Sequence, residues 1–189
     1  MDSCEAMTTL EIRPATEAEI PQIWHLTHDA YVQKGYILPR PDGEFRHYRA
    51  WEDVSVRLVA IIDGRLVGTL TYTLDGEFGL PTDVSYERET DILRAVGLPL
   101  GCCWRIVVAP DCRHQHRVAH GLMIAAAREC VAAGEPVCLC EVNPRHVDYY
   151  RKRLGFREVA RRDSTRGLID APSVLMCGGP GTYSRLLKG

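Results

Sequence analysis

The fold is decided by residues 104–156, which have the sequence WRIVVAPDCRHQHRVAHGLMIAAARECVAAGEPVCLCEVNPRHVDYYRKRLGF. The apolar runs 104–109 and 137–142 predict two strands, and the small-residue-rich run 118–133 between them predicts a helix. A short helix that carries two tyrosines follows the second strand. This arrangement suits an acyl thioester, because it offers strand backbone groups, then a helix N-terminus for phosphates, then a phenol for a leaving thiol.

The rest of the chain predicts further strands and helices around the same sheet. Strand patterns occur at residues 10–13, 57–62, 66–74, 157–162 and 173–177, and apolar residues at helical spacing occur at 17–33 and 87–96. Hairpins come first and strand–helix–strand units follow, which favours an α/β (α+β) fold with one twisted mixed sheet of about six or seven strands flanked by helices. We expect one domain over residues 1–189, an irregular stretch at 35–51, and loose tails at 1–9 and 178–189.

The composition is that of an ordinary globular protein. Hydrophobic residues make up 46% of the 189-residue chain and charged residues make up 25%. No apolar run approaches the roughly 20 residues that a membrane-spanning helix needs. The acidic segment 1–9 contains no apolar signal-peptide core. We therefore expect a cytoplasmic protein without a membrane span.

Eight cysteines are many for a chain of this length. Cys102 and Cys103 are adjacent, and Cys138 and Cys140 lie on one face of a predicted strand, but no paired C-x-x-C arrangement is present. We therefore expect buried, reduced thiols and no metal site. A catalytic thiol is the alternative, and Cys112 is its candidate because a position before a helix N-terminus lowers the pKa of a thiol.

Charge is distributed unevenly along the chain. Residues 1–100 carry 9 lysines and arginines against 17 aspartates and glutamates, whereas residues 101–189 carry 14 against 8. Such a split favours an anionic partner that binds the second half of the chain. The basic residues form no long run and are not interleaved with aromatic residues, so we do not expect nucleic acid as the partner.

The loop at 113–117 (RHQHR) joins the end of a predicted strand to the start of a predicted helix. Free backbone amides and the helix dipole favour phosphate at such a position, and the arginines and histidines add to this. A solvated polar loop is an equal alternative. His114, His116 and His120 have a spacing that can hold zinc, but no carboxylate or thiolate spacing completes the site.

Two residues late in the stretch are candidates for proton transfer. Tyr150, next to Tyr149, can act as general acid towards a departing thiolate, or both rings can pack in the core. Glu141, at the end of a strand, can accept a proton from an amine, or it can pair with an arginine.

Arg105 lies between apolar residues on a predicted strand. Its charge requires either an ionic partner or a cleft. Asp83, Glu89 and Asp91, in the insertion at 76–100, are candidate partners or ligands of a substrate amine, and ordinary surface carboxylates are the alternative.

At this point the chain resembles the GNAT-superfamily acyltransferases. The resemblance rests on Asn143, the tyrosine pair, Leu154-Gly155-Phe156, and Val107-Val108-Ala109-Pro110 followed by Arg113. It implies a three-layer fold whose sheet is splayed between the strands at Val107 and Val142, with the pantetheine of the donor in the splay and backbone amides near Val108 as an oxyanion hole. The donor-binding residues that it implies are Val107, Val108, Arg113, His116, Arg117, Val118, Ala119 and Asn143. Ordinary acetyl-CoA enzymes have glycines at the positions of His116 and Val118, so we expect a donor held mainly through pantetheine.

One branch of the superfamily is more similar. The segments 31–36 (YVQKGY), 78–83 (FGLPTD) and 143–150 (NPRHVDYY) resemble the N-acyl amino acid synthases and the related acyl-homoserine-lactone synthases. The resemblance implies an N-acyltransferase that moves an acyl group from acyl carrier protein or acyl-CoA to a free amine. The substrate-binding residues that it implies are Tyr31, Tyr36 and Asp83. The branch usually has a glutamate where this chain has Cys102, which moves recognition of the amine to another acid such as Glu141.

The resemblance also implies an acidic acyl carrier protein as a partner, because basic residues of the second half can form a docking face. These residues are Arg145, Arg151, Lys152, Arg153, Arg157, Arg161 and Arg162. A charged surface without a partner is the alternative. Two other functions stay open: an ordinary acetyl-CoA-dependent acetyltransferase of a small-molecule amine, and a non-catalytic module that binds thioesters or lipids.

Overall fold

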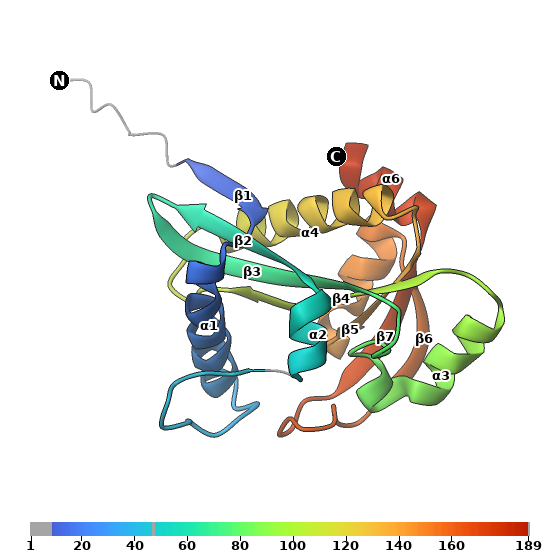
Figure 1. Ribbon diagram of the computed structural model, residues 1–189, viewed down its shortest axis with the longest axis horizontal. Helices are drawn as coiled ribbons and strands as arrows, with labels where there is room; N and C mark the ends of the chain where they lie inside the picture. Colours follow the sequence, from blue (N-terminus) through green and yellow to red (C-terminus); the bar gives the residue numbers. More distant parts are fainter. Residues whose placement is uncertain (1–8, 47, 189) are drawn as a thin grey trace.

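The computed structural model describes residues 9–46 and 48–188. Their seven strands form one mixed sheet in the order β1-β2-β3-β4-β5-β7-β6 (Figure 1), which confirms the predicted fold class. The strands are β1 (Leu10–Pro14), β2 (Val56–Ile62), β3 (Arg65–Leu74), β4 (Leu100–Val108), β5 (Val137–Val142), β6 (Arg157–Arg162) and β7 (Ser173–Gly178). The helices are α1 (Ile20–Gln33), α2 (Arg49–Val54), α3 (Asp83–Ala95), α4 (Gln115–Ala132), α5 (Val147–Tyr149) and α6 (Pro180–Lys188), with short turns η1 (Glu17–Glu19), η2 (Pro144–His146) and η3 (Tyr150–Leu154).

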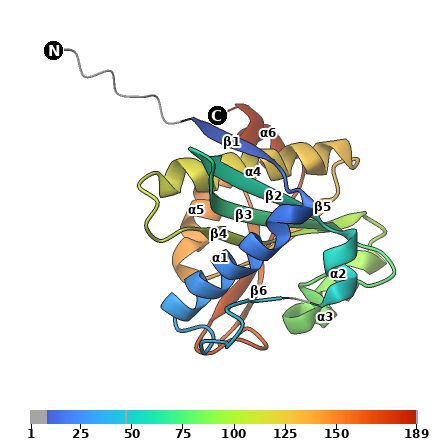
Figure 2. The same ribbon diagram turned by 60° about the vertical axis from the view of Figure 1, so that its left-hand side comes forward.

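Helices cover both faces of the sheet and make three layers (Figures 1 and 2). Helix α4 lies along one face with α6 beside it, and α1, α2 and α3 lie over the other. Successive strand residues face opposite sides, so Leu58 of β2 packs with Leu122 of α4 while its neighbour Val59 packs with Ile23 of α1. No helix in the described part of the chain has the length and apolar character that crossing a bilayer requires.

The strands β4 and β5 separate soon after they meet. They pair in parallel only at Leu100–Val137, Gly101–Cys138 and Cys102–Leu139. Beyond that point β4 continues on β3, and β5 continues on β7. The predicted splay between the two strands is therefore confirmed, and its apex lies at Cys102 and Leu139.

A β-bulge shapes β4 beside the opening. Thr69 pairs with Val107 and Thr71 pairs with Trp104, so two residues of β4 lie opposite one residue of β3. One of the two is Arg105, which has a left-handed backbone with φ 55. A residue with a Cβ rarely adopts this conformation, and a bulge re-aims the side chains around it. The bulge therefore sets the direction of Arg105 next to the splay.

Helix α4 begins at Gln115, earlier than the predicted start at 118. The first turn is polar, so the apolar spacing did not reveal it. Val118 is consequently part of the second turn, where its N–H donates to the carbonyl of His114 at 3.0 Å. Its side chain is fully buried against Gly68, at which a Cβ would come within 2.7 Å of the Val118 methyl.

Two predictions about irregular segments are wrong. The predicted loose tail at 178–189 contains α6, whose Thr182, Tyr183 and Leu186 are buried against the α4 side of the sheet. The predicted irregular stretch at 35–51 includes the start of α2. Both helices are short, and tertiary contacts rather than local pattern stabilise such helices. Of the other predicted tail, residues 1–8 lie outside the described part of the chain.

Candidate active site

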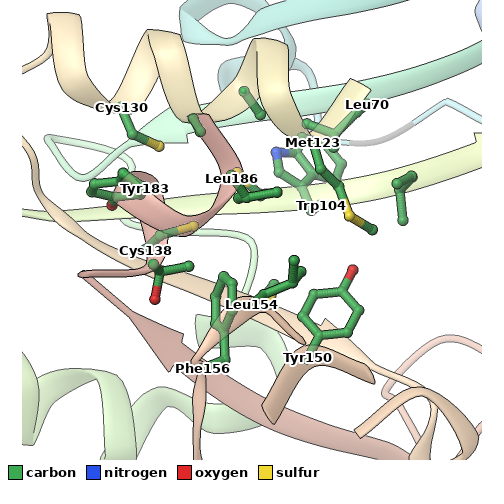
Figure 3. Close-up of a pocket in the computed structure, with 16 residues that line it drawn as sticks. Leu70, Trp104, Met123, Cys130, Cys138, Tyr150, Leu154, Phe156, Tyr183 and Leu186 are labelled. Carbon is green, nitrogen blue, oxygen red and sulfur yellow. The ribbon is translucent and has the colours of Figure 1, made fainter. Parts of the chain in front are cut away.

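An apolar pocket lies between the diverging ends of β4 and β5 (Figure 3). Side chains of β3, β4, β5, α4, α6 and the segment from Tyr150 to Phe156 line a cavity of about 40 Å³. Among the described residues that line it, no side chain is charged. Because an acyl chain and a thioester are apolar, this pocket is the part of the molecule that suits them.

Tyr150 forms part of the pocket wall and points its hydroxyl into the opening (Figure 3). Its ring packs edge-on against Phe156 with a centroid distance of 5.4 Å. Gly155, in the left-handed region at φ 81, ends the π-helical turn η3 and lets the chain return under the ring. Burial raises the pKa of the Tyr150 phenol, so the phenol keeps its proton at neutral pH. The neighbouring Tyr149 is 40% exposed, so the alternative in which both rings pack in the core is wrong.

The backbone of β4 presents a free edge to the pocket. The N–H of Ala109 donates to the carbonyl of Val67 at 2.8 Å on the β3 side. Backbone groups of successive residues in a strand point to alternate sides, so the N–H of Val108 points towards the gap, and that of Val107 points towards β3. Val108 is thus the residue of the pair whose amide can reach a thioester carbonyl.

The first turn of α4 lies at the same end of β4. Gln115 ties this turn to the strand, since its side-chain amide donates to the Pro110 carbonyl at 2.9 Å. Arg113, His116 and Arg117 are exposed around the turn. The backbone amides from 115 to 117 are the ones that a helix leaves free at its start. The Val118 amide is not among them, and the side chain of Val118 is in the core.

Two cysteines that the sequence offered as functional candidates pack against apolar side chains. Cys112 lies against the apolar cluster under α4 and does not line the pocket. Cys102 is fully buried in the cluster with Leu139 and Tyr86, and burial raises the pKa of its thiol. Cys102 pairs with Leu139, so Glu141 lies one step further along the same face, towards the open end of the splay.

Four predicted residues meet on the face of the sheet opposite α4. Tyr31 of α1 stacks edge-on with Tyr36 at a centroid distance of 5.8 Å. Asn143 donates to the Tyr36 hydroxyl at 3.3 Å, so its side chain lies on this side as well as capping η2. Burial raises the pKa of Tyr31, and the charge of Glu141 from β5 acts on it in the same direction.

Arg105 is buried on the same face and is bound to Glu52 of α2. Its guanidinium lies 4.4 Å from the centroid of the Trp104 ring. Its Nε and Nη1 are buried and have no hydrogen-bond partner among residues 9–46 and 48–188. Glu52 also accepts from Nε of Arg57 at 3.0 Å, so one carboxylate serves two guanidinium groups. The sequence analysis missed Glu52, because α2 itself was not predicted.

The carboxylates predicted as partners of Arg105 are bound elsewhere, and that prediction is wrong. Asp83 and Asp91 accept from Arg94, at 2.7 and 2.8 Å. Glu89 binds Arg162 at 2.8 Å. These pairs fasten α3 to its surroundings. Asp83 also accepts from the Leu80 N–H at 2.8 Å, which fixes the turn before α3.

Unlike Glu52, Asp83, Glu89 and Asp91, Glu141 forms no ion pair within the described part of the chain. Its Oε2 is buried without a partner. Burial raises the pKa of this carboxyl to about 7, against smaller opposing effects of Ser173 and Arg162. A carboxyl whose pKa lies near neutrality is suited to accept a proton from an amine.

The basic residues predicted as a docking face are largely paired. Arg151 and Lys152 both bind Asp148, at 2.7 and 2.8 Å. Arg161 binds Glu158 at 2.6 Å. Exposed residues of this group without an ion pair, among those described, are Arg145, Arg153 and Arg157. The surface is therefore less positive than the residue count indicates.

The comparisons with known proteins agree with this geometry. A family model described as N-acyl amino acid synthase FeeM matches residues 22–178. The structure of FeeM, an N-acyl amino acid synthase from uncultured soil microbes, has a TM-score of 0.81 at 17% identity and covers 95% of this chain and 94% of its own. BjaI, a CoA-dependent acyl-homoserine lactone synthase solved with SAM and isopentyl-CoA, has a TM-score of 0.68 at 18% identity, over 96% of this chain and 88% of its own. The polyamine N-acetyltransferase of Drosophila melanogaster has a TM-score of 0.67 at 16% identity, over 90% of this chain and 100% of its own. No curated protein matches the sequence.

Proposed function

The chain belongs to the FeeM family of N-acyl amino acid synthases, and from that premise we propose that its acceptor is a free amino acid whose carboxylate binds Arg105. The protein is an acyltransferase of the GNAT type that moves an acyl group from a pantetheine thioester to an amine. The observation that carries the proposal is the pair of buried, unpartnered nitrogens on the Arg105 guanidinium.

The electrostatics around Arg105 favour an anion. Two guanidinium groups, of Arg105 and Arg57, share the carboxylate of Glu52, and the side chain of Arg105 is only 1% exposed. A buried cation with free donors is costly unless a counter-charge reaches it. A charge-assisted hydrogen bond to a carboxylate oxygen satisfies such a donor, so the α-carboxylate of an amino acid suits this site.

Glu141 lies on the same face and supports the amine end of the proposal. An amino acid held by its carboxylate at Arg105 presents its ammonium group within the cluster of Tyr31, Tyr36 and Glu141. Glu141, with a pKa near 7, takes the proton that the ammonium must lose before it can attack. The free amine then attacks the thioester carbonyl in the splay.

The opposite face supplies the other half of the reaction. The Val108 N–H faces the gap and stabilises the oxyanion as the new C–N bond forms. The C–S bond breaks, and the thiolate takes a proton from the Tyr150 phenol, which burial keeps protonated. The splay thus lets the amine approach from the α1 side while the thioester enters from the α4 side.

The donor binds through features that acyl-CoA and acyl carrier protein share. Both carry a phosphate at the far end of pantetheine. The free amides at 115–117, with Arg113, His116 and Arg117 exposed beside them, form a site for that phosphate.

The test is an acylation assay in which each amino acid is compared with the amine that lacks its carboxylate. We expect the amino acid to be favoured by at least about tenfold in kcat/KM, since a hydrogen-bonded charge pair is worth about 1.5–3 kcal/mol. Arg105→Lys keeps a charge beside Glu52 but loses the free donors, so it should raise KM for the amino acid and leave donor binding unchanged. Equal turnover of both acceptors would refute the proposal.

A further inference from the structure

Three cysteines from separate elements meet at one end of the pocket: Cys103 of β4, Cys130 in the last turn of α4 and Cys138 of β5. Figure 3 shows Cys130 and Cys138 at the end of the pocket away from Tyr150. Their Sγ atoms all lie within 4.8 Å of one another. Cys130 and Cys138 are buried, and Cys103 is partly exposed and lines the pocket. Cys138 pairs with Gly101 of β4, and Cys103 lies two residues further along β4 on the same face, so strand pairing brings these two thiols together.

A buried oxygen without a partner lies beside the thiols. The hydroxyl of Tyr72 forms no hydrogen bond of ordinary geometry, although the residue is only 3% exposed. It lies over Gly101, where a Cβ would come within 2.9 Å of it, and Gly101 pairs with Cys138. Burial raises the pKa of Tyr72, and the Cys130 thiol beside it acts in the same direction.

We propose that Cys103, Cys130 and Cys138 form a metal site for a thiophilic divalent cation, Zn²⁺ above all, with the Tyr72 hydroxyl as fourth ligand. Zinc in proteins is tetrahedral, with Zn–S bonds of about 2.3 Å, which separates its sulfur ligands by about 3.8 Å. The thiols already lie near that spacing. Three sulfurs and one oxygen complete the coordination number.

Charge and access also favour a divalent cation. Three thiolates in an apolar pocket carry a charge of −3, and Zn²⁺ reduces this to −1, so the ion makes deprotonation possible where burial alone opposes it. The partly exposed Cys103 gives the ion an entrance from the pocket.

A bound ion would stabilise the end of the pocket that lies at the apex of the splay. It would link β4, β5 and the end of α4 at the apex of the splay, while leaving the opening at Tyr150 unchanged. The alternative is that the cysteines act only as small apolar side chains, as they do elsewhere in the core. A metal-binding experiment distinguishes the metal site from this alternative, because thiols that only pack in the core bind no metal.

The experiment is a titration of the whole, chelator-treated protein with Co²⁺, followed by displacement with Zn²⁺. We expect one equivalent of Co²⁺ to give a near-ultraviolet thiolate-to-cobalt absorption, and Zn²⁺ to abolish it. Zn²⁺ should also raise Tm, by an amount that grows with the logarithm of its concentration above Kd. Absence of the absorption and of the Tm shift in the wild-type protein would overturn the proposal, whatever the variants do.

Variants assign the ligands. Cys130→Ser should lose the near-ultraviolet absorption, whereas Cys140→Ser should keep it, because Cys140 is buried on the same strand and lines the same pocket outside the cluster. Tyr72→Phe should keep the thiolate absorption but change the visible cobalt bands and weaken binding about tenfold. Circular dichroism and Tm of each metal-free variant establish that it is folded. Retention of the absorption in folded Cys130→Ser would refute this ligand set.

Discussion

The two faces of the sheet differ sharply on either side of the splay. On the α4 side the pocket is apolar, with the Tyr150 hydroxyl as the polar group at its opening. On the α1 side two guanidinium groups, two carboxylates and two phenols lie close together under α1 and α2. The difference agrees with the two proposed substrates, because a thioester is apolar and an amino acid is doubly charged. Each face therefore needs a different test.

The largest effect is expected at Glu52, on the charged face. Glu52→Ala leaves the Arg105 and Arg57 guanidinium groups without their shared carboxylate, at a site where the Arg105 side chain is 1% exposed. Breaking a buried pair in this way costs about 3–5 kcal/mol of the free energy of unfolding. Urea denaturation measures it. Glu89→Ala is the matched control, since its partner Arg162 is 37% exposed and the loss should stay below about 1 kcal/mol. Equal losses would show that the Arg105 cluster is not desolvated.

Tyr150 is the next test, on the apolar face. Tyr150→Phe removes the proton donor but keeps the ring that packs on Phe156. We expect turnover to fall at least tenfold with donor binding nearly unchanged, since general acid catalysis contributes about 10²–10⁴-fold. Steady-state kinetics and a thermal shift with the donor measure the two quantities. Tyr149→Phe, at an exposed neighbour, should have no such effect, and unchanged turnover in Tyr150→Phe would remove the phenol from the mechanism.

The pH dependence of the reaction separates the two faces further. Burial raises the pKa of Glu141 to about 7, so the carboxylate that accepts the amine proton forms only as pH rises through that value. The rate should therefore increase between about pH 6 and pH 8 and then level off. Glu141→Gln should lower the rate and abolish this limb, as a pH–rate profile of both proteins will show. If the rate of Glu141→Gln still rises between about pH 6 and pH 8, a group other than Glu141 accepts the proton.

Much of the fold could be predicted because its strands carry strong local patterns. The strand at 137–142 was predicted at its observed bounds, and the hairpin of β2 and β3 follows from the turn at Asp63-Gly64. Helix α6 could not be predicted, because glycine and proline occupy residues 178–181, across its start, and its helicity depends on packing against α4. Local pattern is thus a sufficient guide where a segment is strongly periodic, and fails where tertiary contacts decide.

Some residues of the candidate site could likewise be predicted from local pattern, and others could not. Tyr150 and Glu141 could be singled out because they stand at the ends of recognisable elements. The partnership of Glu52 with Arg105 could not be predicted, since 52 residues of chain separate them and a bulge aims Arg105 at α2. The meeting of Cys103, Cys130 and Cys138 is likewise a product of strand pairing and helix docking. A search for local ligand spacing such as C-x-x-C cannot detect a cluster of this kind.

The smallest effect on turnover is expected from charge reversal at a surface arginine, and it should depend on which acyl donor is used. Arg153, which has no ion pair, should matter more for docking an acidic carrier protein than Arg161, which Glu158 neutralises at 2.6 Å. Arg153→Glu should slow turnover with an acyl carrier protein donor about threefold at low salt and less at high salt, because steering by surface charge is screened. Turnover with acyl-CoA should not change, and Arg161→Glu serves as the comparison. Equal slowing with both donors would place Arg153 at the shared pantetheine phosphate rather than at a protein partner.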